Sequence, residues 1–275
     1  MSRRTFEAVR LIVLGCLAAA FFLPFFWLVA FSLKPASEIF TGSLNPLPST
    51  LEGFSNYVRA VSVRPLGTYV LNSVIVCSGI LFFQVLFAAP CAYALARLRF
   101  PGRDLIFGLV LFGLLIPIQA TAVPIYSLFA VTGLLDTYAA LIAPFTCSVF
   151  AIFLFRQFFK TIPDDLINAA RMDGCSEFSI VWRILLPLTL PAATAFGIFS
   201  VVSHWNDLFW PLIVVRSSAL NTAPLGLLNF HSGEAGDHYG ELMAGSVIVS
   251  LPLVIGFLVA QRKFIEGISL GAVKG

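Results

Sequence analysis

Charged residues are scarce in this chain of 275 residues. Only 11% of its residues are Asp, Glu, Lys or Arg, whereas soluble domains carry about a quarter. Hydrophobic residues make up 59%, and the mean hydropathy is +0.93. A soluble protein of this length has too little core to bury so much apolar surface, but a lipid bilayer solvates it. The composition therefore excludes an ordinary soluble domain and predicts a membrane protein.

Motifs for catalysis and nucleotide binding are also scarce. The sequence contains neither a G-x-x-x-x-G-K-[ST] phosphate loop nor an H-E-x-x-H zinc motif, and its five cysteines form no C-x-x-C pair. The net charge of +3 is too small to predict nucleic-acid binding. We therefore expect a chain that is not an enzyme, holds no cofactor or metal of its own and binds no nucleic acid.

Long apolar runs are what the sequence does contain. A transmembrane helix requires about 20 mostly apolar residues, and six segments meet this length: 11–33, 69–96, 105–130, 135–159, 188–215 and 242–262. We expect an all-α polytopic membrane protein with six transmembrane helices, forming a single transmembrane domain over residues 1–275. Prolines inside the spans predict kinks, which serve either helix packing or a moving pathway.

The N-terminus offers two alternatives to a first transmembrane helix. Residues 2–6 loosely match a twin-arginine export signal, and residues 13–16 loosely match a lipoprotein cleavage box. The apolar run of 11–33 has 23 residues, which is longer than the core of a typical signal peptide. This length favours a retained helix.

The distribution of Lys and Arg predicts the orientation of the chain. If the N-terminus is cytoplasmic, 13 of the 17 basic residues fall in cytoplasmic segments and 4 in outer segments. Because basic residues concentrate on the cytoplasmic side, both termini are expected there. The longer connections, 34–68 and 216–241, then lie outside. The second one carries His231, Glu234, Asp237 and His238, whose spacing favours a solvated loop over a metal site.

The cytoplasmic loop of about 160–187, between the fourth and fifth spans, predicts a short helix of about 11 residues. Pro163 suits a first helical position, Asp164 and Asp165 complement the helix dipole in the first turn, and Gly174 suits a left-handed C-terminal cap. This element has clear signals for both its start and its end.

One face of this helix predicts a docking surface. Leu166, Ala169, Ala170 and Asp173 fall at i, i+3, i+4 and i+7, which combines small residues with an apolar side chain and a carboxylate. An alternative is a helix lying on lipid headgroups, but such helices are rich in Lys and Arg on their polar face. The composition favours contact with a cytoplasmic partner.

The loop also resembles a family signature. Asn168-Ala169-Ala170, then Gly174, then Ile184, Leu186 and Pro187 match the E-A-A---G---------I-L-P pattern of permease subunits of binding-protein-dependent ABC importers. One departure is Asn168, which stands where the family has glutamate. The resemblance implies a coupling helix that contacts an ATPase through Asp165, Leu166, Asn168, Ala169, Ala170, Arg171, Met172, Asp173 and Gly174.

Three further segments resemble the carbohydrate branch of this family, which includes the smaller maltose permease and second glycerol-3-phosphate permease subunits. They are residues 93–103, residues 205–211, and residues 261–267 together with 271–275. The resemblance implies a multi-pass subunit of the bacterial cytoplasmic (inner) membrane, surrounded by membrane lipid. Its expected partners are a second, different permease subunit, two copies of an ABC ATPase that uses ATP and Mg, and an extracytoplasmic solute-binding protein.

The fifth span carries the candidates for the translocation pathway: His204, Asn206, Asp207 and Trp210. In one helix, His204 and Asp207 would share a face, and Asn206 and Trp210 would share an adjoining face. Polar groups at membrane depth usually face the bundle interior or water. These groups favour a neutral sugar or polyol, and glycerol-3-phosphate or a glycerophosphodiester is the alternative. The same residues could instead only hold helices together, and a secondary transporter is a less favoured class because Asp207 is the one carboxylate well inside a span.

Overall fold

The computed structural model describes residues 3–39, 45, 47–50, 53–62, 65–230 and 239–272. Within these ranges the regular structure is entirely helical. The histidine-containing stretch of the predicted outer loop, 231–238, lies outside the described residues. The expectation of an all-α chain is confirmed for the part that is described.

The chain divides into two compact units. The first comprises residues 1–68 and 226–252, and the second comprises residues 69–225 and 253–275. Helices of the first unit are α1 (Arg3–Ser32), α2 (Ala36–Ile39), α3 (Phe54–Ser62), the end of α14 (Ala223–Leu227), η5 (Leu228–Phe230) and the start of α15 (Tyr239–Ala272). The second unit holds most of α4 (Leu66–Arg97) and the helices from α5 to η4.

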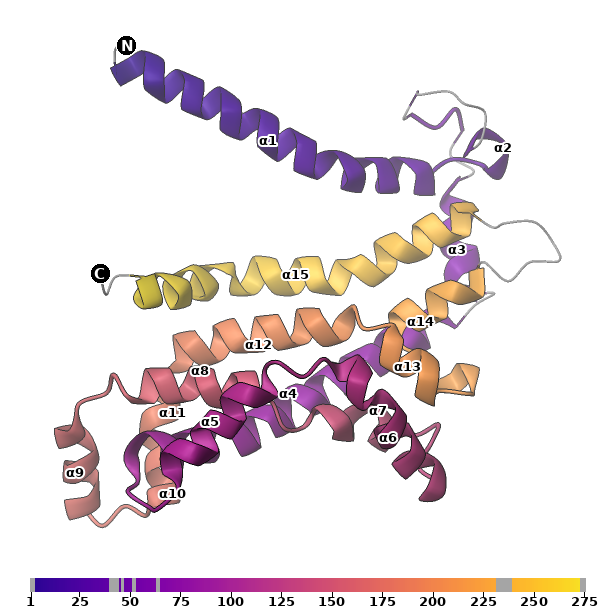
Figure 1. Ribbon diagram of the computed structural model, residues 1–275. Coiled ribbons are helices and arrows are strands. Elements are labelled where there is room, and N and C mark those ends of the chain that lie inside the picture. Colours follow the sequence, from indigo (N-terminus) through magenta and orange to yellow (C-terminus); the bar gives the residue numbers. More distant parts are fainter. Residues whose placement is uncertain are drawn as a thin grey trace. The chain divides into compact units, whose positions relative to one another are not determined.

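Three single helices are long and apolar enough to cross a membrane. They are Thr5–Ser32 in α1, Leu66–Arg97 in α4 and Tyr239–Gln261 in α15, and Figure 1 shows each as one continuous ribbon. They correspond to the first, second and sixth predicted spans. Their length follows from uninterrupted apolar sequence, because such a helix satisfies every backbone group internally.

The remaining spans are broken. Three pairs of helices meet the same test only when each bent pair is taken as one span, which gives up to six spans. The pairs are α5 (Arg103–Gly113) with α6 (Ile118–Val131), bent by 97°; α7 and η2 (Tyr138–Phe145) with α8 (Val149–Phe159), bent by 43°; and the Glu177–Leu188 helix with α12 (Leu190–Trp205), bent by 83°.

Local sequence explains two of these breaks. Pro117 has extended backbone angles (φ −70°, ψ 142°) directly before α6, as expected for a residue that cannot continue the preceding helix. Ser148 is also extended, and its hydroxyl accepts a hydrogen bond from the backbone N–H of Ala151 at 3.1 Å. A side chain that caps a new helix favours a break at that place.

The prediction of one helix over 188–215 is wrong. The helix α12 ends at Trp205, and a separate helix α13 (Phe209–Val214) begins after three intervening residues. The helical spacing that places His204 and Asp207 on one face therefore does not apply across this break.

The second unit has a core built from small and aromatic side chains. Ala88, Ala89 and Ala92 of α4 are buried in one cluster with Phe155, Phe159 and Phe196. The ring centroids of Phe155 and Phe196 lie 5.7 Å apart in an edge arrangement. Small residues on one helix let a neighbouring helix approach closely, so α4 receives the aromatic rings of α8 and α12.

In the first unit, a buried amide joins helices that are distant in sequence. Asn56 of α3 donates hydrogen bonds of 3.0 Å to the carbonyls of Ser32 and Lys34. A Cβ atom on Gly240, at the start of α15, would lie 2.6 Å from Asn56 Nδ2. Only a glycine allows this close approach.

Candidate coupling helix and translocation residues

The predicted cytoplasmic helix is α9 (Asp164–Met172), which has nine residues. Pro163 has extended angles (φ −59°, ψ 139°) and precedes the first helical residue, so it does not occupy the first helical position as predicted. Asp164 and Asp165 do lie in the first turn. The helix is somewhat shorter than the expected 11 residues because its caps lie outside it.

The C-terminal cap confirms the prediction for Gly174. Its φ of +81° lies in the left-handed region. The N–H of Gly174 donates to the carbonyl of Arg171, and the N–H of Cys175 donates to that of Ala170, each at 3.0 Å. These two bonds define a Schellman motif, which ends α9 and turns the chain toward α10 (Glu177–Ile180).

The two faces of α9 differ in burial. Ile167 and Ala170 are buried and join the core cluster of the second unit. Leu166, Ala169 and Met172 are exposed, and Met172 is 88% exposed. The predicted face of Leu166, Ala169, Ala170 and Asp173 therefore does not point in one direction. Ile167 faces the core, and Ala170, three residues later on the same side of the helix, faces the core as well. Ala169 remains as a small outward residue.

Asp165 and Asn168 of α9, and Asp173 at its C-terminal cap, are exposed. Arg171 instead contacts its own chain: its Nε donates to Glu177 Oε1 at 2.9 Å, and its Nη2 donates to Glu177 Oε2 at 3.2 Å. The paired hydrogen bonds with Glu177 raise the pKa of Arg171.

Three residues of this region escape prediction from sequence. Arg97 reads only as a basic residue at the end of a span, yet its guanidinium donates to the carbonyls of Phe159 and Ile162 and contacts Asp164. Tyr93 and Glu177 both contact Arg171. An unlike-charge pair spaced six residues apart, Arg171 and Glu177, is the available signal, but it does not specify a contact without the turn between α9 and α10.

Two of the four predicted pathway residues have structural partners. Trp210 is 1% exposed, and its indole N–H donates to the carbonyl of Ala140 at 2.9 Å. Asp207 Oδ1 accepts hydrogen bonds from the backbone N–H groups of Phe209 at 3.0 Å and Trp210 at 3.4 Å. These contacts cap α13 and anchor it to α7, so they support the alternative that these two residues hold helices together.

The other two are placed differently. Asn206 is exposed, and its amide donates to the carbonyl of Val202 at 2.7 Å. His204 is partly buried, with its ring centroid 4.7 Å from that of Phe145. Of the four pathway candidates, Asn206 is the one whose side chain is exposed. A translocation role for any of the four stays a prediction.

A buried polar network adjoins His204. Gln84 of α4 accepts from the Ser200 hydroxyl at 2.6 Å and donates to the carbonyl of Phe145 at 3.0 Å. Its Nε2 lies 3.3 Å from His204 Nε2. Sequence reasoning missed Gln84, although it is a single amide within the apolar stretch 74–89, which is an expensive position unless the amide has a role.

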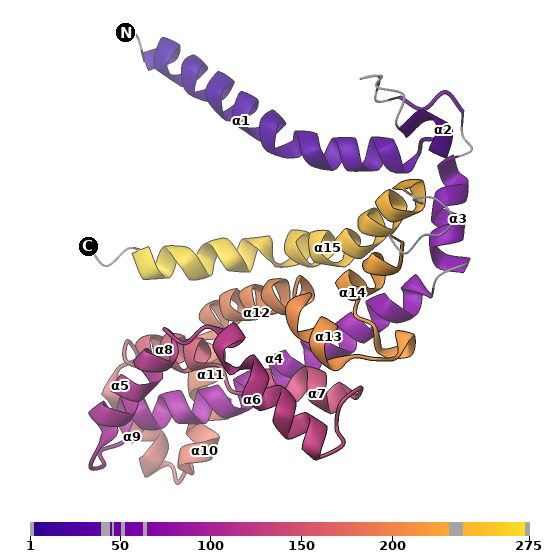
Figure 2. The ribbon, with the colours of Figure 1, turned by 45° about the vertical axis from the view of Figure 1, so that its right-hand side comes forward.

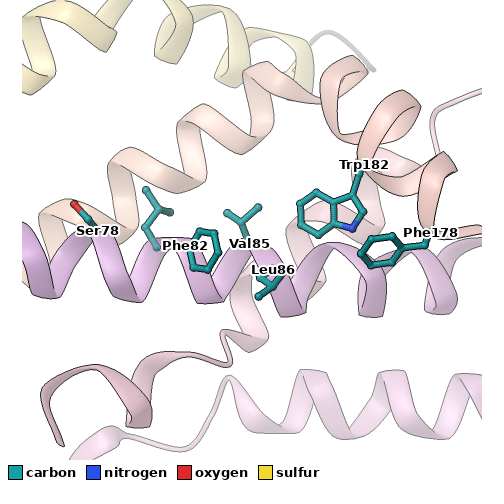
Figure 3. A pocket seen from close by; sticks show the side chains of 7 residues that line it. Ser78, Phe82, Val85, Leu86, Phe178 and Trp182 are labelled. Atoms are coloured by element: carbon teal, nitrogen blue, oxygen red, sulfur yellow. The ribbon is translucent and has the colours of Figure 1, made fainter. Parts of the chain in front are cut away.

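An apolar groove of about 550 Å³ lies beside α4 in the same unit. Figure 3 shows Phe178 and Trp182, from α10 and the following π-helical turn η3 (Val181–Leu185), facing Phe82, Val85 and Leu86. Ser78 supplies the one hydroxyl of its lining. A sugar needs several hydrogen-bonding groups, so this groove does not fit a polar solute.

Comparison with known sequences gives consistent matches. Residues 84–268 match the family described as "Binding-protein-dependent transport system inner membrane component". The arabinooligosaccharides transport system permease protein AraQ of Bacillus subtilis is 37% identical over 261 residues, which cover 94% of this chain and 92% of the relative. The trehalose transport system permease protein SugB of Mycobacterium tuberculosis is 32% identical, with 92% of each chain covered.

A further relative and a solved structure agree with these. The sn-glycerol-3-phosphate transport system permease protein UgpE of Yersinia pestis is 33% identical over 74% of this chain and 73% of its own length. A crystal structure of a bacterial ABC transporter involved in the import of the acidic polysaccharide alginate contains a chain that superposes with a TM-score of 0.82. The identity is 26%, with 96% of this chain and 99% of that chain covered.

Proposed function

This chain belongs to the family of binding-protein-dependent transport system inner membrane components, and we propose that it forms half of the translocation pathway of an ATP-driven importer for sugars or polyols. Its partners are a second, different permease subunit, two copies of an ATPase and an extracytoplasmic solute-binding protein. The chain itself transmits movement and provides passage, while the ATPase subunits bind ATP and Mg.

The observation that carries this proposal is the form of α9. The helix is capped at its C-terminus, its inner face is packed into the core through Ile167 and Ala170, and its outer face presents Leu166, Ala169 and Met172. Exposed apolar side chains on a well-ordered helix at the cytoplasmic end favour a protein partner. An ATPase subunit docked there would pass the closure of its dimer to the transmembrane helices.

A neutral solute is favoured over an anionic one. The helices α12 and α13 contain no Lys or Arg, and the polar groups near them, from Gln84, Ser200, His204 and Asn206, form or offer uncharged hydrogen bonds. Relatives named for arabinooligosaccharides and trehalose support this choice. Glycerol-3-phosphate, for which another relative is named, is the second candidate.

Reconstitution tests the proposal. The chain is purified with its neighbouring permease, ATPase and binding protein, inserted into liposomes and assayed with radiolabelled sugars and glycerol-3-phosphate. Uptake is expected to require ATP and the binding protein, with a sugar or polyol preferred. Uptake by this chain without ATP would instead make it a secondary transporter, and preference for glycerol-3-phosphate would select the second candidate.

We predict that both termini and α9 are cytoplasmic. In a cysteine-free background, Met172→Cys on α9 is expected to be protected from an impermeant thiol reagent added to intact cells. Ser218→Cys, in the exposed turn η4 (Ser218–Leu220), is expected to react. In cells that lack the ATPase subunit, both sites are expected to react after permeabilisation, which controls for accessibility. The reverse pattern in intact cells would invert the topology.

We also predict a pathway role for Asn206. Asn206→Ala is expected to weaken uptake roughly fivefold, because one lost hydrogen bond costs about 1 kcal/mol. Its thermal stability should be unchanged, since among the described residues the side chain bonds only to its own helix. Ser203→Ala, at another exposed position of α12, is the matched control. Wild-type uptake in an assembled Asn206→Ala complex would remove Asn206 from the pathway.

A further inference from the structure

We propose that the last turn of α4 clamps α9 at both of its ends, so that movement of α9 is transmitted directly into this transmembrane helix. Tyr93 and Arg97 of α4 act as positioning residues in this arrangement. The inference rests on the proposed coupling to an ATPase and identifies the helix that receives the movement.

The first contact holds the start of α9. Arg97 Nε donates to the carbonyl of Phe159 at 3.1 Å, and Nη2 donates to the same carbonyl at 2.6 Å. The guanidinium also donates to the carbonyl of Ile162 and pairs with the carboxylate of Asp164. Phe159 ends α8, and Asp164 begins α9. One side chain from α4 therefore ties together the whole connection from α8 to α9.

The second contact holds the end of α9. Arg171 Nη2 donates to the Tyr93 hydroxyl at 3.1 Å, and the Tyr93 hydroxyl donates to Glu177 Oε2. Arg171 and Glu177 are joined by the paired bonds of 2.9 and 3.2 Å described above. The hydroxyl of one buried tyrosine, 2% exposed, thus links the last turn of α9 and the first turn of α10 to α4.

The two contacts come from one face of α4. Tyr93 and Arg97 are four residues apart, so they lie one above the other on an α-helix. Figure 2 shows the end of α4 beside α9 and α10, within the second unit. Arg97 bonds to the beginning of α9, and Tyr93 bonds to its end through Arg171. Because α9 is bonded to α4 at both of its ends, it cannot rotate relative to α4 without breaking these hydrogen bonds.

The polar contacts of Arg97, Tyr93 and Arg171 give α9 a defined orientation, which apolar packing alone does not. Ile167 and Ala170 bury a small apolar face, and apolar contacts are not directional. Hydrogen bonds from a guanidinium to carbonyls and carboxylates require defined distances and angles, and paired arginine–carboxylate bonds fix orientation as well. The clamp therefore converts a packed helix into one whose orientation relative to α4 is specified.

The test measures solute transported per ATP hydrolysed in the reconstituted complex. Arg97→Gln and Glu177→Ala are expected to keep ATPase association and hydrolysis but to lower this ratio about fivefold or more, the size of a typical coupling between sites. The charge-reversed double variant Arg171→Glu/Glu177→Arg is expected to recover at least part of the transport per ATP that Arg171→Glu alone loses. Arg99→Gln is the matched control, since Arg99 is exposed and has no ion pair or hydrogen bond among the described residues.

The outcomes separate the clamp from the proposed function. If the wild-type complex shows no hydrolysis stimulated by the binding protein, the importer assignment fails. If the wild type transports and the clamp variants assemble with an unchanged ratio, only the clamp fails. An unchanged ratio in Arg171→Glu alone would likewise refute it.

A distance measurement with the clamp residues unchanged tests the proposal even if the clamp variants do not fold. Spin labels at Met172→Cys on α9 and Phe87→Cys on α4, both at exposed positions, are placed in an otherwise unaltered clamp. The distance between them is expected to stay the same in the nucleotide-free and ATP-bound complexes. A change in that distance between the two states would show that α9 moves independently of α4 and would overturn the proposal.

Discussion

Replacing Ala169 by tryptophan is expected to lower ATP-driven uptake about tenfold or more while the chain remains folded. Ala169 is an exposed small residue between the exposed side chains of Leu166 and Met172 on α9, so an indole there projects toward any docked partner. A clash that costs about 1.4 kcal/mol of binding free energy weakens association tenfold. We expect a loss of about tenfold or more in ATPase association, measured by co-purification, and a comparable loss of uptake.

Two variants control this experiment. Ala170→Trp changes a residue that is 6% exposed and packed in the core, so it is expected to destabilise the chain by about 1–3 kcal/mol through overpacking and to lower the melting temperature. Ala169→Ser should leave association and uptake near wild type because its side chain is also small. Normal uptake by Ala169→Trp would mean that no partner approaches this face of α9.

Replacing Asn72 by leucine is expected to cause the largest loss of stability. The Asn72 amide is buried and donates to the carbonyls of Ala219 at 2.8 Å and Asn221 at 2.9 Å. Its Oδ1 accepts from the Tyr138 hydroxyl at 2.6 Å. Leucine has a similar volume but no polar atoms, so three partly or fully buried groups lose a partner, each at a cost of up to about 1–3 kcal/mol. We expect a destabilisation of about 3–5 kcal/mol in a thermal unfolding experiment in detergent.

The network offers its own graded control. Tyr138→Phe removes only the hydroxyl and leaves both amide donors of Asn72 paired, so its cost is expected to be about 1–2 kcal/mol. Insertion into the membrane should be retained in both variants, since it depends on apolar length. Equal melting temperatures for wild type and Asn72→Leu would mean that these bonds contribute nothing to the stability of the N-terminal ends of α4 and α7.

Local and compositional features of this protein follow from its sequence. The apolar runs predict the membrane class and the helices α1, α4 and α15, because a bilayer-spanning helix needs only length and an absence of charge. The left-handed cap at Gly174 follows equally directly, since it depends on the conformational freedom of one residue. The family is also predicted from residues 168–187, where three separated parts of the motif match at the family spacing and need no knowledge of packing.

Interactions between distant segments follow only from the tertiary structure. The sequence predicts one continuous helix for the fifth span, but α12 ends at Trp205, and Asp207 accepts hydrogen bonds from the first backbone N–H groups of a new helix. It equally predicts Trp210 for the pathway, whereas the packing of α13 on α7 places that indole on the carbonyl of Ala140. The carbonyl that Trp210 contacts lies 70 residues away in the sequence, so no periodicity reveals it.

The faces of α9 illustrate the same division. Helical spacing groups Ala169 with Ala170, but only the core of the second unit decides that Ala170 and Ile167 turn inward and Ala169 turns outward. Likewise, the sequence shows Arg171 only as a basic residue within the motif. Its contacts with Glu177, across the turn at Gly174, and with Tyr93, at the end of α4, appear only in the structure. The sequence by itself determined that there is a capped helix in this loop. The tertiary structure decided which side it presents, because burial and charge pairing depend on residues that are separated by nearly 80 positions in the chain.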